Sequence, residues 1–272
     1  MSIETTSGVG LPLAVVTGAS DGLGKEFACQ LAADGYDLLL VARRGNLLEE
    51  VKSQIEQQYG VKVEVFVCDL SRADEVRSLE LRLEGEESLE FMVNNAGFGR
   101  NGMFPEVDPD LEEEMIRVHV IALMRLSRAA LVPMCKRKRG FLINLSSVAA
   151  YLVGTNCAEY IATKAYVLSF SKSIQCDVRK HGVRVQALCP GLTHTGFHNT
   201  ETMKGFQKGQ TPSIAWLNAD YVVRSSLNSI RKTKRVVCIP SWLYKLVLVI
   251  MGNPIGNKIC ELFYNEREKN KK

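Results

Sequence analysis

The sequence lacks a C-x-x-C pair, although it contains eight cysteines. Without closely paired thiols it offers neither a zinc-ribbon ligand set nor a disulfide framework. We therefore expect reduced, mostly buried thiols and a cytoplasmic protein. His194 and His198 stand four residues apart, but no acidic or cysteine cluster nearby completes a ligand set, so we predict no metal site.

The sequence also has no large excess of positive or negative charge and no long apolar run. The formal net charge of +4 gives no basis for a nucleic-acid partner. The N-terminus has no basic start followed by an apolar stretch, so no signal peptide is expected. The most apolar segment, Val236–Met251, is interrupted by Pro240 and Lys245 and is shorter than the roughly 20 residues of a membrane span. We interpret it as a last strand followed by a helix that covers the mouth of an active site, with peripheral membrane contact through residues 236–263 as the alternative.

Apolar, β-branched runs alternate with amphipathic stretches along the chain. The predicted strands are Leu13–Thr17, Asp37–Ala42, Val61–Val67, Phe91–Val93, Phe141–Leu145, Val183–Leu188 and Arg235–Ile239. The predicted helices are Leu23–Asp34, Leu47–Tyr59, Ala73–Leu83, Leu111–Lys136, Tyr160–His181 and Ser213–Arg231. This alternation indicates an α/β fold, doubly wound and Rossmann-type, with about seven parallel strands and helices on both faces of the sheet.

No internal repeat, low-complexity segment or linker divides the sequence. We therefore expect a single domain over residues 1–272. Within it we predict a substrate loop at 192–212, where glycines permit hinge-like backbone angles, and an apolar C-terminal segment at 236–265.

Three glycines, Gly18, Gly22 and Gly24, directly follow the first predicted strand and open the first predicted helix. In that position a glycine turn lets the backbone approach a pyrophosphate, and the helix N-terminus supplies N–H donors and positive dipole. A plain tight turn is the alternative, which the placement after a buried strand disfavours.

The second predicted strand ends in Ala42, followed by Arg43 and Arg44. A carboxylate there would bind the ribose 2′-hydroxyl of NAD, whereas arginine accommodates the 2′-phosphate of NADP through its planar fork. We expect NADP(H) in preference to NAD(H), with two ordinary surface arginines as the alternative.

Tyr160 and Lys164 lie four residues apart, thirteen positions after Ser147. On a helix this spacing places both side chains on one face. A phenol has an unperturbed pKa near 10, but a cation about 4 Å away can interact with the phenolate by roughly 4 kcal/mol and bring the pKa toward 7. Such a tyrosine beside a glycine turn predicts acid/base chemistry for hydride transfer between a nicotinamide and a carbonyl.

Together these residues resemble the classical short-chain dehydrogenase/reductase family over essentially the whole chain. The similarity is to the branch of bacterial carbonyl reductases, hydroxysteroid dehydrogenases and 3-oxoacyl thioester reductases. The matching segments are the glycine motif from Thr17 to Gly24, Asp69, Asn94-Asn95-Ala96-Gly97, the set Ser147, Tyr160 and Lys164, and Pro190-Gly191 followed by Thr195.

The resemblance assigns a role to each match. Tyr160 would protonate a carbonyl oxygen, Ser147 would hydrogen-bond that oxygen, and Lys164 would lower the pKa of the tyrosine and hold the ribose beside the nicotinamide. With the two arginines, the expected cofactor-binding residues are Thr17, Gly18, Ser20, Asp21, Gly22, Leu23, Gly24, Arg43, Arg44, Asp69, Leu70, Asn95, Ala96, Gly97, Tyr160, Lys164, Pro190, Gly191, Thr193 and Thr195. The resemblance also implies a homodimer or homotetramer.

One position departs from the family pattern. Where the family usually has an asparagine that steadies a water on the proton path to the lysine, this chain has His119. We include His119 as a catalytic candidate that holds the water or relays protons, because its unperturbed pKa is near 6.5. A packed histidine without a chemical role is the alternative.

The predicted function is reversible, NADPH-dependent reduction of a ketone or aldehyde to an alcohol. The apolar C-terminal segment favours a lipophilic small-molecule substrate such as a steroid or 3-oxoacyl compound, although a subunit contact would use the same surface. The rival is a non-catalytic NADP(H)-sensing or scaffold protein of the same fold. The complete Ser147, Tyr160 and Lys164 set argues against it, and His119 is the one feature in its favour.

Overall fold

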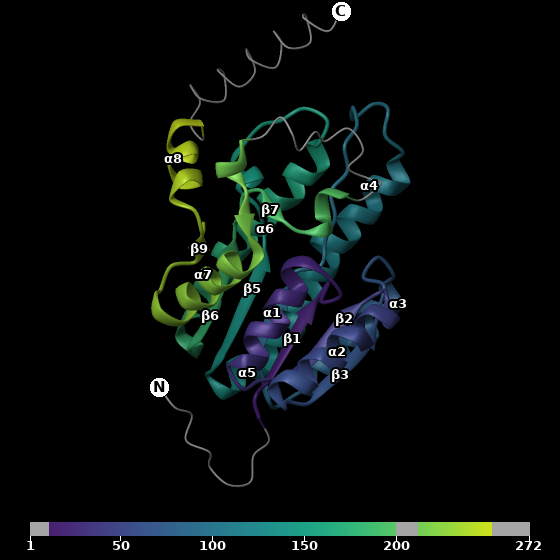
Figure 1. Cartoon of the computed structure of the whole chain (residues 1–272), viewed down its shortest axis with the longest axis vertical. Coiled ribbons are helices and arrows are strands. Elements are labelled where there is room, and N and C mark those ends of the chain that lie inside the picture. The colour runs from purple at the N-terminus through teal and green to yellow at the C-terminus, as the bar shows by residue number, and fades with distance from the viewer. Residues whose placement is uncertain (1–10, 200–211, 252–272) are drawn as a thin grey trace, which may run out of the picture.

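A parallel sheet of seven strands forms the centre of the computed structural model, which describes residues 11–199 and 212–251 (Figure 1). The strands are β1 (Leu13–Thr17), β2 (Asp37–Ala42), β3 (Val63–Val67), β4 (Leu89–Asn94), β5 (Gly140–Leu145), β6 (Val183–Leu188) and β9 (Val237–Cys238). Their order is β3-β2-β1-β4-β5-β6-β9. The order reverses between β1 and β4, so the predicted doubly wound, Rossmann-type fold is confirmed.

Helices cover both faces of this sheet. On one face lie α1 (Gly22–Ala33), α2 (Gly45–Tyr59) and α7 (Ala219–Lys232); on the other lie α3 (Ala73–Glu84), α5 (Leu123–Arg137) and α6 (Ala158–Val178). Alternate residues of β1 serve the two layers: Ala14 and Val16 belong to the first apolar cluster, and Leu13 and Val15 to the second. A strand buried on both faces needs this continuous apolar sequence.

The long helix predicted over Leu111–Lys136 differs from the structure in its middle. It consists of α4 (Pro109–Ile116), a π-helical turn (Arg117–Ala122) and α5. The π-turn shifts the hydrogen-bond register by one residue and therefore changes the face on which the following side chains lie. His119 lies within this turn.

By length and composition, one helical stretch in the described ranges could cross a membrane, namely Pro109–Arg137. Of its most apolar window, 56% is buried inside the protein. Met115, Leu126 and Met134 are fully or almost fully buried, the latter two in the cluster beneath the sheet. Packing against the sheet thus accounts for this apolar face.

The predicted start of the last helix, at Ser213, is wrong. Residues Ser213–Ala215 form a short 3₁₀ turn, and β8 (Leu217–Asn218) then pairs with β7 (Thr193–His194) before α7 begins at Ala219. Trp216 has extended backbone angles, which interrupt the helical periodicity predicted from Ser213 onward. After β9 the chain forms α8 (Trp242–Met251), at the same end of the molecule as β7 (Figure 1).

Candidate active site

A large cleft lies at the carboxyl ends of β1, β4, β5 and β6, with a volume of about 1490 Å³. Pockets for drug-sized ligands occupy roughly 300–1,000 Å³, so this cleft has room for a dinucleotide and a substrate together. All the predicted site residues line it except Thr17, Gly24 and His119, which lie directly behind its wall.

The glycine turn between β1 and α1 forms one end of the cleft. Gly18 and Gly22 have positive φ angles of 66° and 56°, which residues with side chains rarely adopt. A Cβ on Gly24 would lie 2.1 Å from the Gly18 carbonyl oxygen, so α1 can start this close to β1 only with glycine there. The Asp21 carboxylate accepts the Gly22 N–H at 2.7 Å and caps the helix. The turn and helix N-terminus fit a pyrophosphate.

Thr17 and Asn95 support that turn from behind. The Thr17 hydroxyl accepts the N–H groups of Asn95 and Ala96, each at 3.0 Å. The Asn95 amide donates to the Thr17 carbonyl at 2.9 Å and to the Gly18 carbonyl at 3.3 Å. These bonds fix the end of β4 against the glycine turn. Thr17 therefore supports the turn without lining the cleft itself.

The arginines at the end of β2 lie on the far side of the glycine turn. Arg44 donates to the Ser20 hydroxyl at 2.9 Å. Arg43 lies 3.8 Å from a carboxylate oxygen of Asp69 and 3.4 Å from one of Glu114. Both guanidinium groups line the cleft, so the pair forms a cationic edge beside the turn.

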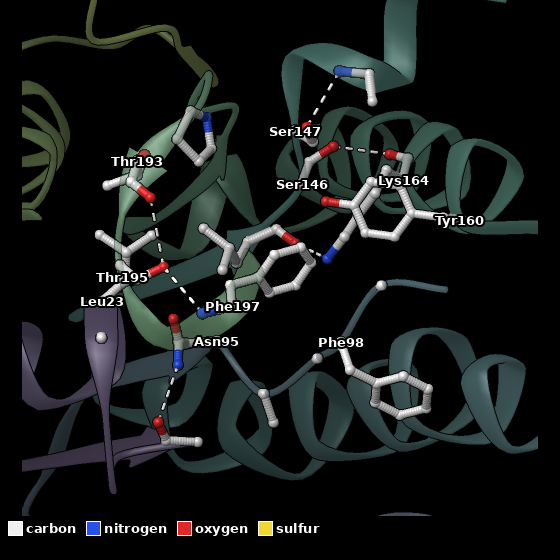
Figure 2. A pocket seen from close by; sticks show the side chains of 18 of the residues that line it. Leu23, Asn95, Phe98, Ser146, Ser147, Tyr160, Lys164, Thr193, Thr195 and Phe197 are labelled. Atoms are coloured by element: carbon white, nitrogen blue, oxygen red, sulfur yellow. Dashed lines mark hydrogen bonds between the residues drawn. The ribbon is translucent and has the colours of Figure 1, made fainter. Parts of the chain in front are cut away.

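The reactive end of the cleft combines residues from β5 and α6 (Figure 2). Ser147 follows β5, and its hydroxyl accepts the Ala149 N–H at 3.1 Å. Tyr160 and Lys164 lie on α6, as their spacing predicted. The Lys164 ammonium donates to the Leu145 carbonyl at 3.0 Å and lies 5.6 Å from the centre of the Tyr160 ring. Ser146 donates to the Lys164 carbonyl at 2.7 Å and holds this part of α6 on β5.

The expectation that Lys164 brings the pKa of Tyr160 toward neutrality is wrong for this structure. Burial raises the pKa of Tyr160 to about 12, which outweighs the opposing hydrogen bond from Ser147. Burial also lowers the pKa of Lys164 to about 8. The loss of hydration penalises each charged form, and the ammonium faces the Leu145 carbonyl rather than the phenol oxygen. Tyr160 therefore retains its proton at neutral pH.

His119 has both ring nitrogens occupied. Its Nε2 accepts the Phe98 N–H at 3.0 Å, and its Nδ1 lies 3.0 Å from the Thr163 hydroxyl oxygen. That hydroxyl donates to the Tyr160 carbonyl at 2.9 Å, so the imidazole is neutral with its proton on Nδ1. Burial, and then the charge of Lys164, hold the pKa of His119 well below its usual value. The ring is therefore neutral at neutral pH, and a relay through it stays a prediction that the pH–rate profile tests.

The sequence model of the short chain dehydrogenase family matches residues 12–204. The chain belongs to this family.

Two very-long-chain 3-oxoacyl-CoA reductases are similar in sequence to this chain. A very-long-chain 3-oxoacyl-CoA reductase of Laccaria bicolor is 32% identical over 249 residues, which cover 89% of this chain and 64% of that protein. A reductase of the same name from Anas platyrhynchos is 34% identical over 184 residues, which cover 65% of this chain and 58% of that protein. The chain spans about three fifths of the length of these relatives.

A solved structure shows the same short-chain dehydrogenase fold. The short-chain dehydrogenase from Sphingobium yanoikuyae in complex with NADPH superposes with a TM-score of 0.80 at 29% identity, over 85% of this chain and 89% of that chain. Together with the family match, this supports the assignment of the cleft as a nucleotide site.

Many residues of this short-chain dehydrogenase that were not predicted individually also line the cleft, among them three aromatic ones. Phe98 and Phe197 line it, and the Phe197 ring centre lies 6.1 Å from that of Tyr160. Tyr244, on α8, also lines it. Of the predicted substrate loop at 192–212, residues 200–211 lie outside the described residues, as do residues 252–265 of the predicted C-terminal segment.

Proposed function

We propose that the protein is an NADPH-dependent reductase that converts the ketone of a 3-oxoacyl thioester with a long acyl chain to an alcohol. The observation that carries the proposal is the placement of Ser147, Tyr160 and Lys164 in the same cleft as the glycine turn. An acid, a hydrogen-bond donor and a nucleotide cradle are what a ketone reductase requires.

The glycine turn supports a dinucleotide, and Arg43 and Arg44 support its 2′-phosphate. Ala42 leaves no carboxylate at the end of β2 to compete for the ribose. When bound, the nicotinamide supplies the hydride that reduces the carbonyl carbon.

The chain's own residues supply the proton and the polar contacts. Tyr160, with its pKa of about 12, is a protonated donor for the carbonyl oxygen as negative charge develops there. Ser147 hydrogen-bonds the same oxygen and lowers the cost of that charge. Lys164 remains mostly cationic at neutral pH and favours the tyrosinate that proton donation leaves.

The walls near Tyr160 support a lipophilic substrate. Apolar side chains from the segment after β5 and from α6 line this part of the cleft: Val148, Leu152, Val153 and Ile161. The names of the relatives, very-long-chain 3-oxoacyl-CoA reductases, agree with an acyl chain in this position. We therefore place 3-oxoacyl thioesters ahead of steroids and small ketones.

A substrate series tests this proposal. NADPH consumption would be followed with 3-oxoacyl thioesters of increasing chain length, a 3-oxosteroid, an aromatic ketone and a small diketone. We expect kcat/KM to rise by about tenfold over the first two or three added pairs of methylenes, since each buried methylene contributes roughly 0.8 kcal/mol, part of which is lost to ordering the chain. A small diketone or a steroid as the best substrate would contradict the chosen class.

The same series decides between an enzyme and the non-catalytic, NADP(H)-sensing alternative. A sensor would bind NADPH without consuming it with any carbonyl compound. The partly buried, protonated Tyr160 beside Ser147 favours the enzyme, because a scaffold has no use for a partly desolvated acid in its ligand cleft.

A further inference from the structure

Tyr244 contacts the backbone at the reactive end of the cleft. It lies on α8, beyond residues 12–204 that the family model matches. Its ring packs on Gly191, where an added Cβ would lie 1.9 Å from a ring carbon. The tyrosine therefore occupies the space that any other residue at 191 would fill.

The hydroxyl of Tyr244 joins two backbone segments. It accepts the Leu192 N–H at 3.0 Å and donates to the Ala215 carbonyl at 2.8 Å. Leu192 and Ala215 stand before and after residues 200–211. One hydroxyl thus uses its donor and one acceptor site to hold both stems of the expected substrate loop. Burial raises the pKa of Tyr244, so the donor is retained at neutral pH.

The segment held by Tyr244 is the one expected to meet the nicotinamide. Thr193 and Thr195 follow Leu192 directly and line the cleft, and the Thr193 hydroxyl donates to the Gly191 carbonyl at 3.0 Å. Leu217 donates its N–H to the Leu192 carbonyl at 2.8 Å, which continues the pairing of β7 with β8. Tyr244 is the side chain that accepts the Leu192 N–H, so both backbone polar groups of Leu192 have partners.

We propose that Tyr244 is a positioning residue that sets the backbone of Gly191 to Thr193 for the nicotinamide half of the cofactor and thereby makes α8 part of the site. The inference rests on the proposed NADPH binding, but not on the proposed substrate. Its distinctive consequence is that loss of the hydroxyl weakens the hold on the nicotinamide half alone, because Arg44 and the glycine turn, which would hold the adenosine half, do not contact Tyr244.

Binding measurements on Tyr244→Phe test this role. The variant keeps the ring on Gly191 and removes both hydrogen bonds. Titrations would measure the Kd of NADPH and the Kd of adenosine 2′,5′-bisphosphate, which lacks the nicotinamide. Two hydrogen bonds with typical net contributions correspond to a loss of about fivefold to tenfold in NADPH affinity. The bisphosphate should bind within about twofold of the parent protein, and the Tm should fall by less than about 3 °C.

Tyr221→Phe is the matched control. The Tyr221 hydroxyl also donates to a backbone carbonyl, that of Pro240 at 2.9 Å, but the residue does not line the cleft. We expect this variant to bind both ligands like the parent. Equal weakening of both ligands in Tyr244→Phe, or no weakening of either, would overturn the positioning role. A parent protein that binds NADPH but reduces no ketone would instead contradict the proposed function and leave this role standing.

Discussion

Two side chains at the reactive end of the cleft, the partly buried Tyr160 and the buried Lys164, have pKa values shifted in opposite directions by one cause. Burial raises the pKa of Tyr160 to about 12 and lowers that of Lys164 to about 8. At neutral pH the phenol is therefore neutral and the amine mostly charged. Over the pH range in which enzymes are usually assayed, Lys164 is the member of this pair that titrates.

This sets the expected pH dependence of reduction. Because the lowered pKa of Lys164 means that its proton is lost as pH rises through about 8, the cationic form is present below that pH and disappears above it. We expect kcat/KM for reduction to be nearly flat from about pH 6 to 7 and to fall above about 8. Lys164→Arg, which keeps its charge, should lose rate but also lose this decline. A parent profile that rises steadily to about pH 10 would contradict the assignment.

His119 is expected to act by position rather than by titration. Its neutral ring connects the Phe98 N–H to Thr163 and so joins the end of β4 to α6. His119→Leu leaves the Phe98 N–H unpaired and removes one of the two partners of the Thr163 hydroxyl, so it should lower kcat more than it weakens NADPH binding. His119→Asn, which retains a donor and an acceptor, should keep substantial activity.

The pH–rate profile of the parent should show no inflection near 6.5, because burial holds the pKa of His119 well below that value. Two results would count against this account: an inflection there that His119→Asn removes, or full activity of His119→Leu.

Site residues could be predicted from the sequence where their spacing along the chain is enough to place them together. The glycines of the turn, and Tyr160 with Lys164, were found because they follow one another within a strand–turn–helix or on one helix. The contact of Tyr244 with Gly191 could not be found, because 53 residues separate them and only the folded chain brings α8 to that point. The direction of the Tyr160 pKa shift also depends on burial, which a four-residue spacing does not reveal.

Among the elements, the end of β2 determines the choice of cofactor. Arg43 and Arg44 line the cleft there, and no acid occupies the last position of the strand. We expect NADPH to bind at least about tenfold more tightly than NADH, which corresponds to about 1.4 kcal/mol. Arg43→Ala should remove most of this difference and Arg44→Ala part of it, with NADH binding nearly unchanged in both.

Fluorescence titration of both cofactors measures this preference. Arg72→Ala is the control, since Arg72 is exposed, pairs with Glu75 at 2.8 Å and does not line the cleft. Equal dissociation constants for NADPH and NADH in the parent protein would exclude the proposed role of the two arginines.

Elements with one consistent periodicity were predicted well, and elements that change periodicity were not. Strands β1, β2 and β6 have the predicted bounds because they are continuous apolar runs. The π-turn in Arg117–Ala122 was missed, because one extra residue in a helical turn hardly changes the spacing of the apolar positions around it. The stretch before α7 was taken for helix because Trp216 and Leu217 extend its apolar pattern, although they belong to a turn and a short strand.

For the molecule as a whole, the site combines a nucleotide cradle from the N-terminal half with a reactive end from the middle of the chain. The matched family model covers both parts and ends at residue 204. The C-terminal helix α8 then adds Tyr244 to the cleft. The fold class followed from the alternation of strands and helices alone, whereas the contribution of α8 depends on long-range packing.

The most direct test of the account is the turnover of Tyr160→Phe with a long-chain 3-oxoacyl thioester, measured together with its affinity for NADPH. The variant loses the proton donor and keeps the ring, so the rate should fall on the order of 10²–10⁴-fold while the Kd of NADPH stays within about twofold. Tyr166→Phe, on the same helix but stacked on Phe170 away from the cleft, should match the parent in both. Near-parent turnover by Tyr160→Phe would contradict the assignment of this cleft as the active site of a reductase.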